Sequence, residues 1–154
     1  MVDKDKWVRC DRDFIGYGKS NEEKNVYILI SQNSVSTADF VAFMLKQHES
    51  VKIIGTSTAG EGIADTYCVD VMPNSGITFQ FQHSQAFNAD KTDNSVFGTS
   101  PDIYIAHTFE SIAKRNQLMR EGKDYKAYEN RLKWDNVLIE TLEIIENASA
   151  TRSK

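Results

Sequence analysis

The fold is decided by residues 26–55, which read VYILISQNSVSTADFVAFMLKQHESVKIIG. The stretch begins and ends with short apolar runs rich in β-branched residues, at 26–30 and 51–55, which are typical of strands buried on both faces of a parallel sheet. Between them, apolar residues recur at helical spacing, and Ser36 is placed to open the helix. We therefore predict two adjacent parallel strands joined by a helix through a right-handed crossover.

Further along the chain the apolar pattern changes to strict alternation. Apolar residues alternate at 67–71 and at 77–81, on either side of a Pro-Asn-Ser-Gly turn at 73–76. This pattern predicts an antiparallel hairpin with one apolar face. The polar stretch 84–100 is expected to form a loop, and a further short strand is expected at 103–105.

The C-terminal third shows helical periodicity. Helices are predicted at about 108–120 and 125–147. The resulting fold class is α/β, with a parallel sheet, a β-hairpin and C-terminal helices. We expect a charged N-terminal segment at 1–25, a core domain at 26–147 and a flexible tail at 148–154.

Composition excludes several classes of protein. The chain has 154 residues, of which 40% are hydrophobic, so it can bury one domain core. Its formal net charge of −4 disfavours nucleic-acid binding, which needs a basic face. No apolar run approaches the ~20 residues of a membrane span, and residues 1–13 lack the apolar core of a signal peptide. Cys10 and Cys68 are read as ordinary thiols.

The candidate chemistry lies directly after the first predicted strand. Ser36 is at the expected N-terminus of the helix, where backbone N–H groups are unpaired and the helix dipole is positive. Such groups can stabilise the oxyanion of an acyl-transfer intermediate, and open α/β sheets bind ligands at the carboxyl ends of their strands. Ser36-x-x-Asp39 also resembles a capping box with Asp in place of Glu or Gln, so helix capping explains the same residues.

Four short motifs occur in an order that is typical of one protease family. They are SVSTAD at 34–39, GEG at 60–62, PDI at 101–103 and WDNVL at 134–138. Through the first three, residues 26–102 resemble the catalytic core of the C-terminal processing (tail-specific) serine proteases, a group with tricorn-core-like and retinoid-binding-protein-like relatives. The fourth is similar to the closing D-x-x-L helix of that family. The resemblance implies a Clp-protease/crotonase-like fold of stacked ββα units. It also implies that this chain holds the C-terminal part of the catalytic core.

The resemblance implies roles for five residues. Ser36, the middle serine of its motif, takes the nucleophile position, and the N–H of Thr37 contributes to an oxyanion hole. Gly60 and Gly62 could supply further backbone donors or simply allow a positive φ. They flank the position of the family's general base, a lysine that is replaced here by Glu61. A glutamate with a reference pKa near ~4.3 is a weak base toward a serine hydroxyl, so the Ser/Lys dyad is absent. Glu61 can equally be an exposed loop carboxylate without a role.

No histidine precedes the candidate nucleophile, although the tricorn-like branch of the family uses one together with a glutamate. His48 lies on the same predicted helix as Ser36, about 18 Å away at ~1.5 Å per residue. His83 and His107 are interpreted as solvated side chains. We expect the chain to be part of a longer protein in which Glu61 orients a histidine from a preceding segment. A native, non-catalytic short form is the alternative.

The predicted function is a serine-type peptidase core that cleaves polypeptides through an acyl-Ser36 intermediate and is inactive as an isolated fragment. The resemblance implies a polypeptide substrate, no metal and no organic cofactor, and a homodimer is compatible with it. The alternative is a non-catalytic module that binds a hydrophobic ligand or peptide on the same fold, and a structural fragment with neither activity is a third reading. The resemblance suggests a cell-envelope or secreted parent protein, but the sequence leaves substrate, compartment and oligomeric state open.

Overall fold

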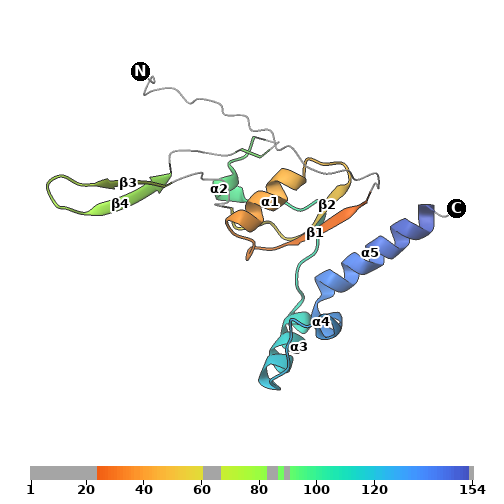
Figure 1. The fold of residues 1–154 in the computed structure, drawn as a ribbon. Coiled ribbons are helices and arrows are strands. Elements are labelled where there is room, and N and C mark those ends of the chain that lie inside the picture. Colours follow the sequence, from red (N-terminus) through yellow and green to blue (C-terminus); the bar gives the residue numbers. More distant parts are fainter. Residues whose placement is uncertain (1–23, 61–66, 83–86, 89–90, 153–154) are drawn as a thin grey trace.

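A parallel sheet forms the centre of the chain (Figure 1). The computed structural model describes residues 24–60, 67–82, 87–88 and 91–152. Within them, β1 (Val26–Ile30), β2 (Val51–Gly55) and β5 (Ile103–Tyr104) form a sheet in the order β1-β2-β5, with both pairs parallel. The first two strands have the predicted bounds and are adjacent, as expected from two short apolar runs. The α/β architecture of parallel sheet, hairpin and C-terminal helices is therefore confirmed.

The helix that joins the first two strands lies over the sheet (Figure 1). This helix, α1 (Thr37–Leu45), places Ala42 in a small core with Ile30, Val51 and Ile53. The side chains of this core are almost entirely removed from water, so they supply the apolar burial that holds α1 on the sheet. The carboxyl end of β1 and the N-terminus of α1 consequently meet at one edge of the sheet.

A two-stranded hairpin projects from the sheet domain (Figure 1). It consists of β3 (Tyr67–Val71) and β4 (Thr78–Gln82), which pair antiparallel as predicted. Its apolar side chains include Val69 and Phe81, which are 64% and 45% exposed.

The expectation of a single apolar face on this hairpin is wrong. Val69 lies opposite Gln80, and Asp70 lies opposite Phe79. Because directly opposed residues share a face of an antiparallel pair, the valines of β3 and the phenylalanines of β4 are on different faces. The cause is the turn, which takes up residues 72–77. The pairing is therefore shifted by one residue from the register in which the apolar residues of the two strands would lie opposite one another.

The expected loop at 84–100 contains a short helix, α2 (Asn94–Phe97), which the sequence reasoning missed. The Asp93 side chain caps it by accepting a hydrogen bond from the Ser95 N–H. The four residues of α2 are too few to show helical periodicity, and the polar cap residue is equally common in loops.

The C-terminal region contains α3 (Phe109–Arg120), as predicted, followed by two helices where one was expected. These are α4 (Tyr128–Trp134) and α5 (Asn136–Arg152), so the prediction of a single helix at 125–147 is wrong. The chain breaks at Asp135, whose backbone is not helical and whose carboxylate accepts a hydrogen bond from the Leu138 N–H at 3.1 Å. Helix α5 contacts β1 and β2, and it continues into the segment expected as a tail. None of the described helices is long and apolar enough to cross a membrane.

Candidate functional site

Ser36 occupies a sharp turn between β1 and α1. Its backbone has φ 58° and ψ −125°, values that resemble the first central residue of a type II′ turn, where glycine is usual. Its side chain is exposed and makes no hydrogen bond to cap the helix. A non-glycine residue held in such a conformation stores about 1–3 kcal/mol and persists only when its surroundings impose it. The turn therefore presents the Ser36 hydroxyl to solvent at the start of a helix.

The capping-box interpretation of Ser36 and Asp39 is not supported. The Asp39 carboxylate is buried, and its Oδ1 accepts hydrogen bonds from Thr58 Oγ1 at 2.5 Å and Thr99 Oγ1 at 2.7 Å. Within the described residues its Oδ2 has no hydrogen-bond partner, so the carboxylate does not bond to the Ser36 N–H. In the described part of the chain, no hydrogen bond engages the N–H of Thr37 either. The first turn of α1 thus keeps an open backbone donor next to an uncapped serine.

Gly60 lies beside this turn. It forms an isolated parallel bridge with Val35, the residue before Ser36, and the adjacent Ala59 N–H donates to the Ser34 carbonyl at 3.2 Å. A Cβ on Gly60 would stand 2.5 Å from the Asn94 carbonyl oxygen, so the close approach of these backbones requires glycine. Thr37 and Gly60 are therefore both brought to the Ser36 turn. Glu61 and Gly62 lie outside the described residues.

A buried polar cluster, which the sequence reasoning missed, lies under the same turn. Its members are Asp39, Thr58, Asn94 and Thr99, and we call it the Asp39 cluster. Thr58 Oγ1 accepts from the Thr99 N–H at 2.7 Å, and Asn94 Nδ2 donates to Thr99 Oγ1 at 3.2 Å. Only the Ser-x-x-Asp spacing signalled Asp39 in the sequence, and nothing in the sequence marked its partners.

No histidine in the described part of the chain hydrogen-bonds to the Ser36 hydroxyl. His48 lies beyond the other end of α1, where its Nδ1 is 2.8 Å from Ser50 Oγ. His107 precedes α3 and contacts the C-terminal helices, and His83 is outside the described residues. These contacts of His48 and His107 are therefore with residues other than Ser36.

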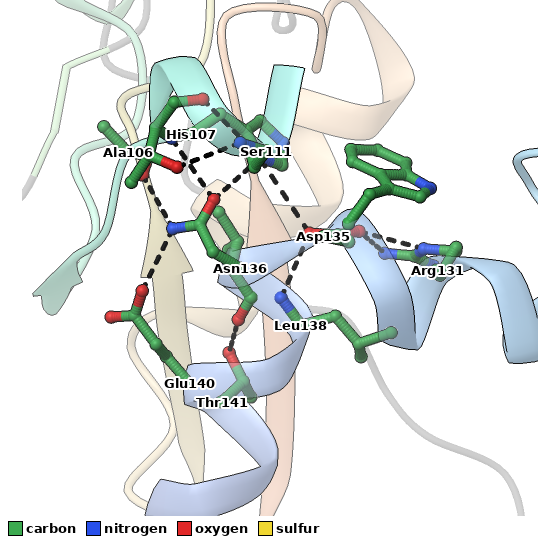
Figure 2. Close-up of polar contacts among 12 residues, drawn as sticks. Ala106, His107, Ser111, Arg131, Asp135, Asn136, Leu138, Glu140 and Thr141 are labelled. Atoms are coloured by element: carbon green, nitrogen blue, oxygen red, sulfur yellow. Dashed lines mark hydrogen bonds and ion pairs between the residues drawn. The ribbon is translucent and has the colours of Figure 1, made fainter. Parts of the chain in front are cut away.

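His107, Ser111 and Asp135 have the residue types of a catalytic triad but not its geometry (Figure 2). Ser111 Oγ and Asp135 Oδ1 both lie on the Nδ1 side of the ring, at 3.5 Å and 3.9 Å, whereas a triad uses both ring nitrogens. The buried Asp135 carboxylate binds the Arg131 guanidinium through two hydrogen bonds of 2.9 Å and 2.6 Å. This group therefore holds the helices together, which gives the Trp-Asp-Asn-Val-Leu motif a structural role.

A cavity of about 230 Å³ opens between the strand ends and the C-terminal helices. Its lining combines Leu29 and Ile105 with the polar side chains of His107, Arg131 and Asp135. Small-molecule pockets usually measure roughly 300–1,000 Å³ and are mostly apolar, so this cavity is small for a lipid. Over the described ranges, no group of three His, Cys, Asp or Glu side chains could hold a metal ion.

Comparison with known proteins decides the family. The model of peptidase family S41 matches residues 4–105, about two thirds of the chain. The chain belongs to peptidase family S41. This membership confirms the resemblance to the C-terminal processing proteases. No curated protein matches it.

Several solved structures are similar to this S41 chain. A putative peptidase from Parabacteroides merdae is 25% identical with a TM-score of 0.48, over 58% of this chain and 27% of that one. Mature CPAF complexed with lactacystin is 28% identical with a TM-score of 0.49, over 75% of this chain and 20% of that one. The chain thus spans about a quarter or less of the length of these structures.

Proposed function

We propose that Ser36 is the nucleophile of a serine peptidase that cleaves polypeptides. The observation that carries the proposal is the Ser36 turn itself, with an exposed and uncapped hydroxyl held at φ 58° in a chain of family S41. A serine whose role was to cap α1 would accept a hydrogen bond from the first turn of the helix, and Ser36 does not.

The reaction would proceed in two steps. Ser36 Oγ attacks the scissile carbonyl carbon and loses its proton to a base. The base returns this proton to the amine, which leaves as the tetrahedral intermediate collapses to an acyl-Ser36 ester. Water then hydrolyses this ester and regenerates the serine. The N–H of Thr37 and the positive end of α1 would stabilise the negative oxygen of each intermediate, with the backbones of Gly60 and Gly62 as further donors.

The base is the missing component. Glu61 replaces the family's lysine, and a carboxylate is too weak a base to activate a serine hydroxyl by itself. In our proposal Glu61 orients a histidine supplied from outside this chain. The isolated chain should therefore show little or no peptide turnover.

Labelling with a fluorophosphonate probe, followed by mass mapping, tests the nucleophile in the longer parent protein that would supply the histidine, because the probe reacts with a serine that a base activates. Modification at Ser36 that disappears in Ser36→Ala and persists in Ser34→Ala supports the proposal. Modification at Ser34 would show that the choice within the motif is wrong. Robust cleavage of an unstructured peptide by the isolated chain, abolished by Ser36→Ala, would instead show that the chain contains its own base, with His83 the first suspect.

A binding module for a hydrophobic ligand remains the competing proposal. It predicts no labelling at Ser36 and saturable uptake of a fluorescent lipid. The small size and polar lining of the cavity beside His107 count against it. Absence of both labelling and uptake would contradict both functions.

A further inference from the structure

The Asp39 cluster has a property that neither helix capping nor core packing explains. The Asp39 side chain is fully buried, yet its Oδ2 has no hydrogen-bond partner in the described part of the chain. Burying a carboxylate in this way is costly. An apolar side chain at the same position in α1 would avoid that cost. The role of the carboxylate is therefore expected to lie in the residues that its Oδ1 binds.

The carboxylate imposes one direction on the hydrogen bonds around it. The hydroxyls of Thr58 and Thr99 both donate to Oδ1 of this carboxyl group. Their lone pairs are then available to accept from the Thr99 N–H and from Asn94 Nδ2. The cluster therefore has one arrangement of protons, which favours one geometry over alternatives.

The Ser36 turn is held by contacts on both of its sides. On the upstream side, Ser34 and Val35 are held by Ala59 and Gly60. On the downstream side, Asp39 holds the first turn of α1 to Thr58, which belongs to the same segment after β2, and to Thr99. Residues 36–38 remain exposed between these two attachments. A strained φ at Ser36 needs surroundings that impose it, and these attachments supply them.

We propose that Asp39 is a positioning residue for Ser36, which it serves by tying α1 to Thr58 and Thr99. The proposal rests on the proposed function, because it assumes that the turn serves to present the Ser36 hydroxyl as the nucleophile. Asp39 does not touch the substrate in this proposal, and it acts only through the backbone of residues 36–39. Its loss should lower the reactivity of Ser36 without changing how well a probe binds.

The test compares fluorophosphonate labelling of the parent protein, which would carry the base for Ser36, in four forms: wild type, Asp39→Asn, Thr99→Val and Ser111→Ala. Ser111 is equally buried and polar but lies in α3, so its variant controls for general loss of stability. At a temperature where circular dichroism shows each form to be folded, we expect the limiting labelling rate to fall at least about tenfold in Asp39→Asn and Thr99→Val. The probe concentration for half the limiting rate should stay unchanged, and Ser111→Ala should label like the wild type. Unchanged limiting rates in both cluster variants would overturn the proposal.

Amide hydrogen exchange provides a readout that does not depend on the proposed function. The amides of Phe40 and Ala59 hydrogen-bond to the carbonyls of Ser36 and Ser34, so they report on the two attachments of the turn. Both should exchange at least about tenfold faster in Asp39→Asn than in Ser111→Ala. If the wild type is not labelled but exchange rises as expected, the proposed function fails and the anchoring by Asp39 stands. If exchange at both amides is unchanged, Asp39 does not hold the turn.

Discussion

Replacing Ser36 separates a strained nucleophile turn from an ordinary helix cap. Because the hydroxyl makes no cap hydrogen bond, Ser36→Ala should change the free energy of unfolding by less than about 0.5 kcal/mol. Ser36→Gly should relieve about 1–3 kcal/mol of backbone strain at φ 58° and lose about 0.5–1 kcal/mol through greater freedom of the unfolded chain. The net expectation is a gain of roughly 1 kcal/mol for Ser36→Gly, from the difference of these two magnitudes.

Urea unfolding followed by circular dichroism measures these differences, with Thr108→Ala as the matched control. Thr108 is a true N-cap, since its Oγ1 accepts from the Ser111 N–H at 3.1 Å, and its loss should cost about 1 kcal/mol. The reasoning is refuted if Ser36→Ala loses as much stability as Thr108→Ala, because the serine would then act as a cap. It is also refuted if Ser36→Gly is less stable than the wild type.

Two further predictions concern the sheet and α3. Gly55→Ala should lower the free energy of unfolding by more than about 2 kcal/mol, because at φ 127° the added Cβ would stand 2.0 Å from the Ile30 carbonyl oxygen. Gly76→Ala, at φ 70° in open space, should cost only about 1 kcal/mol. Equal losses of stability in urea unfolding would contradict this prediction. The hydrogen bond from Lys114 and then its charge lower the pKa of the Glu110 carboxyl. Since this pKa is lowered on folding, the pair's contribution is present above the unfolded pKa and is lost as pH falls through the folded one. Lys114→Met should therefore raise the pKa of Glu110 in an NMR titration, and an unchanged midpoint would show that the pair does not persist in solution.

The fold around the site could be predicted from local pattern, whereas several of its details could not. The runs at 26–30 and 51–55 became adjacent parallel strands with the expected bounds, because a strand buried on both faces needs a continuous apolar run. The faces of the hairpin were wrong, because register depends on how many residues the turn absorbs, and alternation alone does not state that number. The break at Asp135 was missed, because a carboxylate that caps α5 interrupts the helical pattern at only one position.

The sequence by itself indicated the family through motif order, and it determined the strand–helix–strand unit and the place of Ser36 at the start of α1, since these depend on neighbouring residues. Tertiary structure alone decided what the Asp39 side chain binds, since its partners Thr58 and Thr99 are 19 and 60 residues away along the chain. It also decided that Ser36 adopts a positive φ, because strain of this kind is imposed by attachments on both sides of a turn rather than preferred by the residue. The roles of Ser36, Thr37, Gly60, Glu61 and Gly62 in catalysis stay predictions. The catalytic role of a residue depends on which reacting atoms lie around its side chain, and neither the local sequence pattern nor the backbone conformation shows those atoms.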